Sequence, residues 1–332
     1  MNYIGSKSRL SSWIKDEVKN VVGDDLSDKV FCDLFAGTGI VGRVFKSEVK
    51  EVISNDLEYY SFVLNKNYIE NSIMIKDSTQ YIEKLNLLKP RNDGFIYKHY
   101  CMGSGSNRQY FSDGNGQKID AIRMQIELWK KYHDISDNLY YFLLASLIES
   151  ADKIANTASV YGSFLKKLKK TALQDIILEA AEFEKTLTTH TVYHDDSNLL
   201  IKKIRGDILY LDPPYNQRQY SLNYHLLNTI SEYKEFIPKG KTGSPTYNRS
   251  KYSKSKVVHK NFEELLQNAN FKYIFLSYNS EGLMSQEEVK SIMIKYGTYT
   301  LVKKEYKRFT TINTTTPQLN QTFEYLHILE KN

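Results

Sequence analysis

The sequence predicts an α/β fold with a mostly parallel sheet and an inserted, mainly helical domain. Near the N-terminus, an apolar run at 30–35 leads through glycines into a helical pattern, and a second apolar run ends at Asn55 before another helix. Such strand–helix alternation is typical of parallel sheets. Residues from about 120 to 184 then have helical patterning alone, and strand patterning returns after residue 190. A helical block inside an α/β chain indicates an insertion.

The middle of the chain supplies the boundaries of that insertion. Glycine, aromatic and asparagine residues are frequent in 87–117 and predict irregular structure. Three segments with helical patterns follow, at 121–132, 139–155 and 172–187. We therefore expect one domain formed by residues 1–77 and 189–332, and a helical domain formed by residues 78–188.

The C-terminal third is expected to complete the sheet. A helix is predicted at about 222–235 and is followed by a basic loop. Beyond the loop, the pattern predicts a helix, a strand, a helix and two strands at 261–269, 272–279, 285–297, 299–309 and 322–331. The last two strands resemble an antiparallel hairpin that closes a mostly parallel sheet.

Composition excludes several classes of protein. The 332 residues contain no run of eighteen apolar side chains, so no membrane span is expected. The first twenty residues lack the apolar core of a signal peptide. Cys32 and Cys101 are too few for a disulfide framework and lack metal-ligand spacing, so we expect no metal site. Both cysteines fit a reducing cytoplasm, where we expect the protein.

Positive charge is concentrated in two places. The net charge is +6, and residues 239–260 alone hold seven Lys or Arg and no acid, so the rest of the chain sums to −1. A second cluster puts four lysines into the five positions 166–170. One such segment alone suits a solvated surface loop, but two of them favour a nucleic-acid partner.

A glycine turn follows the first predicted strand. In "DLFAGTGIVG", Gly37, Gly39 and Gly42 let the backbone turn sharply and approach a ligand closely. Asp56 ends the next strand, where an acid can accept hydrogen bonds from both ribose hydroxyls of an adenosine. The same spacing fits a nicotinamide dinucleotide, S-adenosylmethionine or a tight turn without any ligand, and the glycines do not decide between them.

Two further polar positions are candidates for ligand binding. In "YHDDSN", Asp196 follows an apolar run and either accepts a hydrogen bond from an adenine amino group or caps the helix that begins there. In "NYIGSK", Tyr3 and Lys7 lie close together, and Lys7 either pairs with a ligand carboxylate or is a surface lysine.

The most informative stretch is "ILYLDPPY", in which a strand ends in an acid, two prolines and an aromatic residue. Proline fixes φ and has no N–H, so this backbone is stiff. Asp212 and the carbonyl of Pro213 can form two acceptors in one orientation, with the flat ring of Tyr215 close by. Two acceptors and a stacking surface match the amino group of a flat heterocycle, such as N6 of adenine or N4 of cytosine.

Methyl transfer is the chemistry that this arrangement suits. The lone pair of such an amino nitrogen is delocalised into the ring. When two protein acceptors take hydrogen bonds from both of its N–H groups, that pair is freed to attack a methyl group. A carboxylate held in place stabilises the positive charge that develops on nitrogen. Because the nitrogen lies inside a duplex, the base must be flipped into a pocket.

The succession "NYIGSK", "DLFAGTG", "NDLEYY", helical insert, "DDSN", "LDPPY" and "LSYN" resembles the Dam-like D12-class DNA adenine-N6 methyltransferases over nearly the whole chain. The resemblance implies a Rossmann-like class I methyltransferase sheet, S-adenosylmethionine as cofactor and a target-recognition role for residues 78–188. It also implies double-stranded DNA as partner, an associated restriction endonuclease and a bacterial, nucleoid-associated protein. The N-terminal motif departs from the family at Tyr3 and Ser6, where tryptophan and a second glycine are common.

The resemblance assigns roles to individual residues. Those implied for the cofactor are Tyr3, Lys7, Phe35, Gly37, Gly39, Asp56, Asp196 and Asp212. Those implied for the target base are Asp212, Pro213 and Tyr215. The chemistry of the side chains adds candidates for DNA contacts, because Arg and Gln read base edges and basic groups neutralise phosphates. These candidates are Arg108, Gln109, Lys166, Lys167, Lys169, Lys170, Arg218, Tyr220, Arg249, Lys251 and Lys254.

Other functions remain open at this level. Cytosine-N4 methyltransferases more often resemble "SPPY", so Asp212 favours adenine, and enzymes that methylate RNA or protein glutamine have asparagine at that position. A nicotinamide-dependent oxidoreductase would use the glycine turn but has no need of "DPPY". A catalytically silent DNA-binding protein would keep the basic segments without the reaction.

Overall fold

The computed structural model describes residues 6–216, 219–246, 249–307 and 321–332. They form two compact units. We call the first the helical unit; its described part consists of Ser6 and residues 58–187 and 220–246. The second is the sheet unit, whose described part consists of residues 7–57, 188–216, 219, 249–307 and 321–332.

The sheet unit contains one seven-stranded sheet in the order β3-β2-β1-β4-β5-β7-β6. Its strands are β1 (Val30–Asp33), β2 (Glu51–Asn55), β3 (Thr191–Tyr193), β4 (Arg205–Leu211), β5 (Asn270–Asn279), β6 (Gly297–Lys307) and β7 (Gln321–Lys331). The pairs from β3 to β5 are parallel, whereas β7 pairs antiparallel with both β5 and β6. The predicted mostly parallel sheet with an antiparallel C-terminal hairpin is therefore confirmed.

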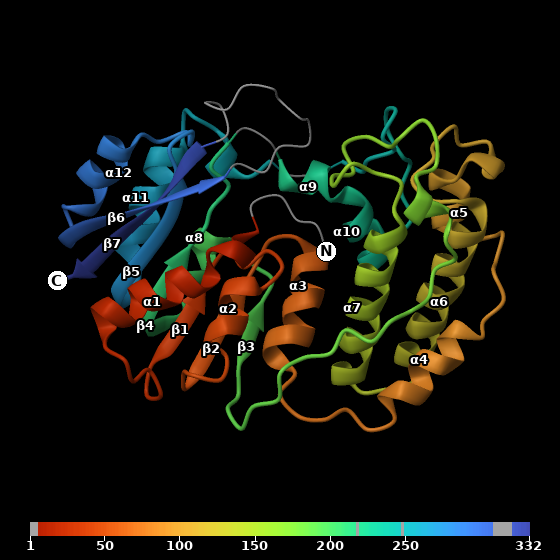
Figure 1. Cartoon of the computed structure of the whole chain (residues 1–332), viewed down its shortest axis with the longest axis horizontal. Coiled ribbons are helices and arrows are strands. Elements are labelled where there is room, and N and C mark those ends of the chain that lie inside the picture. The colour runs from red at the N-terminus through yellow and green to blue at the C-terminus, as the bar shows by residue number, and fades with distance from the viewer. Residues whose placement is uncertain (1–5, 217–218, 247–248, 308–320) are drawn as a thin grey trace. The chain divides into compact units, whose positions relative to one another are not determined.

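Helices cover both faces of this sheet because successive side chains of a buried strand point to opposite sides. Phe31 of β1 stacks on Phe45 of the helix α2, with ring centroids 4.1 Å apart. Its neighbour Cys32 belongs instead to the core that contains Phe262 and Val289. Figure 1 shows the helices of the two faces. They are α1 (Ser11–Val22) and α2 (Ile40–Phe45) on one face, and α8 (Ser197–Leu200), α11 (Val258–Asn268) and α12 (Gln286–Met293) on the other.

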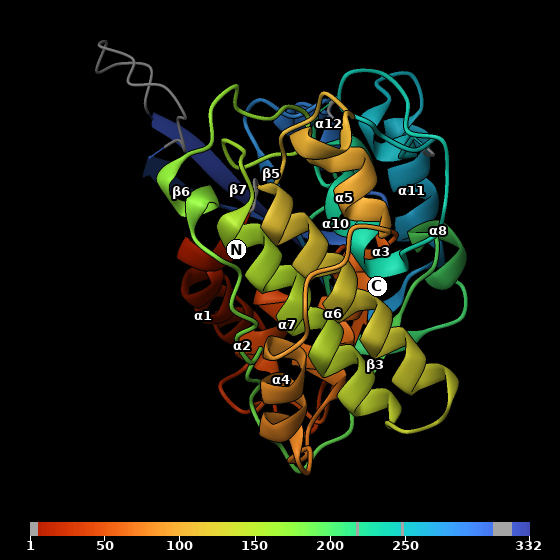
Figure 2. The same ribbon diagram turned by 90° about the vertical axis from the view of Figure 1, so that its right-hand side faces the viewer.

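The helical unit has its own core, built around α6 and α7, which pack side by side (Figure 2). Both helices begin with a serine whose side chain accepts a hydrogen bond from a backbone N–H of the first turn, Ser112 for α6 and Ser136 for α7. The helices of this unit are α3 (Tyr59–Asn65), α4 (Ser78–Asn86), α5 (Phe95–Tyr100), α6 (Asp113–Lys131), α7 (Asp137–Ile154), α9 (Tyr220–Asn223) and α10 (His225–Glu232). Short 3₁₀ or π turns occur at Lys7–Arg9, Lys66–Glu70, Met102–Ser104, Lys170–Leu173 and Lys251–Ser253.

The helix predicted at 172–187 is wrong. After the turn at Lys170–Leu173 the chain has no regular structure up to residue 187, and it buries Ile176 and Leu178 by alternation. Side-chain amides supply the backbone hydrogen bonds that a helix would otherwise make. Asn115 binds the carbonyl of Gln174 and the N–H of Ile176, both at 2.8 Å, and Asn86 binds Leu178 in the same way.

The compact units divide the chain at different residues from the expected boundaries at 77/78 and 188/189. Residues 58–77 and 220–246 group with the helices and not with the sheet. The reason is packing, because α3 and α10 contact each other and both contact α7. The functional roles expected for the two domains stay predictions. Within the described parts of the chain, no helix has the length and apolar character needed to cross a membrane.

Candidate active site

The predicted cofactor and catalytic residues of the sheet unit gather where its parallel strands end. The chain moves outward from β1 to β2 and β3 in one direction, and to β4 and β5 in the other. The strand order therefore reverses between β1 and β4, which is where open α/β sheets bind ligands. Asp33 is the last residue of β1, and Asp212 directly follows β4.

The glycine turn after β1 requires glycine at two positions. Gly37 and Gly39 have φ values of 52° and 75°, in the left-handed region that other residues avoid. The N–H of Gly37 donates to the Oδ2 atom of Asp56 at 2.8 Å. Asp56, predicted to bind a ribose, therefore lies beside the turn and supports it.

A buried lysine joins two carboxylates beside this turn. The Nζ atom of Lys7 lies 2.9 Å from Oδ1 of Asp212 and 3.0 Å from Oε1 of Glu324 in β7. Lys7 is only 6% exposed and Glu324 only 3%. Lys7 is thus an internal cation and not a surface lysine. Sequence reasoning missed Glu324, which lies in a strand that carries no recognisable motif.

The electrostatics of Asp212 reflect this burial. Removal from water raises its pKa, Lys7 lowers it and Glu324 raises it again, with a net value of about 6. Burial lowers the pKa of Lys7, but the charges of Asp212 and Glu324 outweigh that effect and hold it well above its usual value. At neutral pH the pair is ionised.

Asp33 is a second buried carboxyl at this edge and was also missed. Burial and the neighbouring charge of Asp212 raise its pKa to about 8. Its Oδ2 atom accepts from the N–H of Gly42 at 3.3 Å. Its Oδ1 atom is buried without a hydrogen-bond partner among the described residues. The acid at the start of "DLFAGTG" was the signal available in the sequence.

The residues after Asp212 surround the buried charges with rings. Pro213 is buried, and the ring centroid of Tyr215 lies 5.9 Å from the ammonium of Lys7. Tyr215 also meets Tyr278 edge to face at 6.3 Å, and its carbonyl accepts from the N–H of Leu283 at 2.9 Å. The strand end therefore places an acid and an aromatic ring together in a fixed frame.

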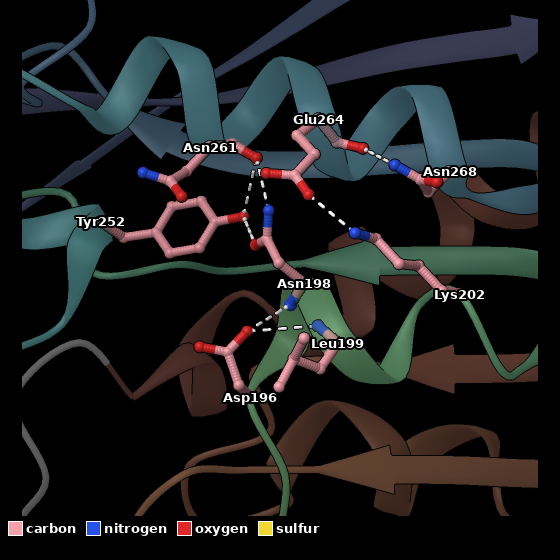
Figure 3. Close-up of polar contacts among 8 residues, drawn as sticks. All are labelled: Asp196, Asn198, Leu199, Lys202, Tyr252, Asn261, Glu264 and Asn268. Atoms are coloured by element: carbon pink, nitrogen blue, oxygen red, sulfur yellow. Dashed lines mark hydrogen bonds and ion pairs between the residues drawn. The ribbon is translucent and has the colours of Figure 1, made fainter.

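Asp196 caps a helix in this structure (Figure 3). Its Oδ1 atom accepts from the N–H groups of Asn198 and Leu199 at 2.9 and 3.2 Å, at the start of α8. The alternative interpretation raised by the sequence is thus the one that the contacts support. Binding of an adenine ring by Asp196 stays a prediction.

A tyrosine that sequence reasoning overlooked fixes the basic segment beside α8. The hydroxyl of Tyr252 donates to Oδ1 of Asn198 at 2.8 Å and lies 3.4 Å from the carbonyl of Asn261 (Figure 3). Its ring meets Phe35 edge to face at 5.1 Å. The buried Tyr252 thereby anchors a segment whose basic neighbours, Arg249, Lys251 and Lys254, are exposed.

The DNA-contact candidates of the helical unit fall into two groups. Arg108 donates to the carbonyls of His99, Gly240 and Lys241 at 3.0–3.3 Å, so its guanidinium holds a loop in place. Lys169 likewise donates to the carbonyl of Thr157. Gln109 accepts from Asn156 through its main chain, and Tyr220 stacks on Tyr224. In contrast, Lys166, Lys167 and Lys170 are exposed. Tyr3 and Arg218 lie outside the described residues.

The sheet and the site together define a class I methyltransferase. The strand order with its antiparallel end, the glycine turn after β1 and the lysine-paired acid of "DPPY" after β4 are the features that define it. Residues 3–292 match the model of the D12 class N6 adenine-specific DNA methyltransferases. The chain belongs to this family.

Several modification enzymes are similar to the chain over its whole length. The type II methyltransferase M.NlaIII of Neisseria lactamica is 61% identical, with 100% of this chain and 99% of the relative aligned. M.FokI of Planomicrobium okeanokoites is 38% identical over 100% of this chain and 53% of its own length. M.CviAII of Paramecium bursaria Chlorella virus 1 is 37% identical over 93% of this chain and 92% of its own length.

The protein is an adenine-specific DNA methyltransferase of the restriction-modification type. The family and its relatives decide for adenine over cytosine, and for an enzyme over a nicotinamide-dependent oxidoreductase or a silent DNA-binding protein. The predicted reaction class is therefore confirmed.

Proposed function

We propose that the sheet unit transfers a methyl group from S-adenosylmethionine to N6 of an adenine flipped out of duplex DNA, with Asp212, the carbonyl of Pro213 and the ring of Tyr215 holding the base. The observation that carries this proposal is the placement of Asp212. Its carboxylate directly follows β4, is 17% exposed, pairs with the buried Lys7 and is followed by the ring of Tyr215.

The residues around the glycine turn suit the proposed cofactor. A tight turn with two positive φ values leaves room for close approach, and Asp56, directly after β2 and bonded to the turn, is the acid proposed for the ribose hydroxyls. The buried Oδ1 of Asp33 lacks a partner among the described residues and suits a ligand donor. Lys7, Phe35 and Asp196 complete the proposed set. When bound, the cofactor supplies an electrophilic methyl group on a sulfonium.

Asp212 has two tasks in this proposal. As a carboxylate it accepts an N–H hydrogen bond from the amino group and stabilises the positive charge that develops on nitrogen. It is also placed to take the proton that the nitrogen must lose. With a pKa of about 6 it is ionised at neutral pH and still basic enough to share that proton. Tyr215 holds the flat base by stacking.

Phosphate contacts are proposed for the exposed basic side chains. Arg249, Lys251 and Lys254 of the sheet unit are exposed, and so are Lys166, Lys167 and Lys170 of the helical unit. Neutralising phosphates with these groups would make binding steeply dependent on salt. An endonuclease that cleaves the same sequence is the proposed partner, because several relatives bear names of type II modification enzymes.

The test is expression in a host that lacks adenine methylation, followed by single-molecule sequencing of its DNA. We expect one recurrent sequence with modified adenine. Asp212→Ala should reduce the rate by roughly 10²–10³-fold or more. The fold should survive, because Lys7 keeps Glu324 as its partner.

Asp207→Ala is the matched control, since Asp207 lies on the same strand but near its other end and binds the N–H of Val30. It should methylate normally. Calorimetric titration of both variants with S-adenosylmethionine provides the second measurement. Methylation by Asp212→Ala at the wild-type rate, or absence of binding by the wild type, would refute the proposal.

A further inference from the structure

Glu324 has no role in the reaction described so far, yet its carboxylate is one of the most deeply buried charges of the sheet unit. It lies on β7, where it pairs in register with Asn279 of β5. It is 3% exposed, and its Oε1 atom lies 3.0 Å from Nζ of Lys7. Burying a carboxylate is costly, and a second carboxylate beside the same lysine adds repulsion between like charges. Stability alone is a poor reason to place it there.

The geometry divides one positive charge between two carboxylates. Lys7 is 2.9 Å from Asp212 and 3.0 Å from Glu324, so neither carboxylate has the ammonium to itself. If Asp212 had sole use of Lys7, its negative charge would be largely neutralised and its lone pairs would be committed. A carboxylate in that state is a weak acceptor for a nucleobase amine.

We propose that Glu324 is a positioning residue that acts through Lys7: by holding the ammonium, it keeps Asp212 only partly paired and therefore a strong acceptor for the amino group of the base. The inference rests on the proposed role of Asp212. Glu324 itself touches neither the base nor the methyl donor in this account.

Few other groups influence Asp212 between pH 5 and 7. Among the described residues, the titratable side chains near it are Lys7, Glu324, Asp33, Tyr210 and Tyr215. Burial raises the pKa of Asp33 to about 8 and raises the pKa of Tyr210 well above its usual value, so both side chains are mainly neutral in this range. Tyr210 donates to Ser277 at 2.8 Å. The charges of Lys7 and Glu324 therefore control the ionisation of Asp212.

The two partners act on the Asp212 pKa in opposite directions, which gives the test its sign. Glu324→Gln removes a negative neighbour and should lower that pKa by about 1 unit. Lys7→Met removes the positive neighbour and should raise it by roughly 1–3 units. In the double variant, the pKa of Asp212 should lie between its values in the wild type and in Lys7→Met. A residue needed only for folding would not produce opposite shifts.

The experiment measures the pKa directly and through activity. The carboxyl ¹³C signal of Asp212, assigned with Asp212→Ala, is titrated in the full-length protein, and kcat/KM is recorded from pH 5 to 8. We expect the acid limb of kcat/KM to follow the carboxyl pKa in each variant. At pH 8, Glu324→Gln should lower kcat by about 10-fold, the equivalent of a pKa shift of about 1 unit, and leave the KM for DNA unchanged.

Glu330→Gln is the matched control, because Glu330 lies on the same strand and pairs with Lys272, but both side chains are exposed. It should change neither the Asp212 pKa nor kcat. Shifts in the same direction for Glu324→Gln and Lys7→Met, or no shift for Glu324→Gln, overturn the inference. If the two variants shift the Asp212 pKa in opposite directions but the acid limb of kcat/KM does not follow, the proposed role of Asp212 is refuted instead. If Glu324→Gln fails to fold, the comparison of Lys7→Met with the double variant decides.

Discussion

The two units of this protein bury charged side chains for different purposes. In the helical unit, Arg123 donates to the carbonyls of Ile230 and Ser231, both at 2.9 Å, at the end of α10. Asp120 accepts from the N–H groups at the start of α5. In the sheet unit, by contrast, the charge of Lys7 faces the side chains of Asp212 and Glu324.

This difference separates charges that hold backbone groups from those for which we propose a function. A charge that closes backbone hydrogen bonds has nothing left to offer a ligand, and it stabilises one arrangement of helices. A charge that is balanced by another side chain keeps lone pairs and can exchange partners. Burial alone does not distinguish the two, since Arg123 and Lys7 are both almost fully buried.

The largest effect on stability is expected for Arg123→Met. The change leaves two buried carbonyls without donors and should lower the free energy of unfolding by about 3 kcal/mol. Methylation per folded molecule should remain normal. Urea unfolding and a methylation assay at low temperature measure both quantities. Arg91→Met is the control, because Arg91 pairs with Asp93 at the surface and its loss should change the free energy of unfolding little. If Arg123→Met abolished methylation without lowering stability, the interpretation of Arg123 as a structural charge would be wrong.

A second prediction uses two buried carboxyls with similar pKa values. Burial raises the pKa of both Asp212 and Asp120 to about 6. The proposed mechanism requires Asp212 to be ionised, so kcat/KM of the wild type should fall as the pH drops below about 6. Asp120→Asn should leave this limb in place. If Asp120→Asn shifts the acid limb of the kcat/KM profile, the activity depends on a buried charge of the helical unit, and the distinction between the two units is wrong.

Asp120 should instead appear in the pH dependence of stability. Its folded pKa is raised above the unfolded value, so its contribution is present below that unfolded value and is lost as the pH rises through about 6. Asp120→Asn should remove this slope from unfolding curves measured between pH 4 and 7.

The smallest effect concerns Asp196, which belongs to the sheet unit but bonds to backbone as the helical-unit charges do. Asp196→Ala removes the cap of α8 and should cost about 1 kcal/mol, whereas Asp196→Ser keeps a capping oxygen and should cost little. Both variants lose the carboxylate proposed for the adenine ring, so both should raise the KM for the methyl donor. If Asp196→Ser left the KM for the methyl donor unchanged, Asp196 would serve only as the cap of α8.

Much of the sheet unit could be predicted because its signals are local. The glycines at 37 and 39 are required by positive φ values, and the strand that ends in "DPPY" is a continuous apolar run. The alternation of strands and helices in 30–65 and in 258–331 indicated the layers of the sheet. Local patterns of this kind depend on a few neighbouring residues, and tertiary contacts did not override them.

Helical propensity failed at 172–187 because the competing hydrogen bonds come from elsewhere. Asn115 and Asn86 lie in other segments and bind the backbone of this one, so its own sequence cannot reveal them. Arg108 shows the same limit, since its type suits base reading while its position commits it to three carbonyls. A prediction from one segment cannot include partners supplied by another.

The sequence by itself determined the reaction class and a mostly parallel sheet with an antiparallel end, and it predicted the acid proposed for catalysis. Only the tertiary structure decided which charges surround that acid, because Lys7, Asp212 and Glu324 come from the two ends and the middle of the chain. The strength of a carboxylate as an acceptor depends on distances of about 3 Å and on exclusion from water, and neither can be read along the chain.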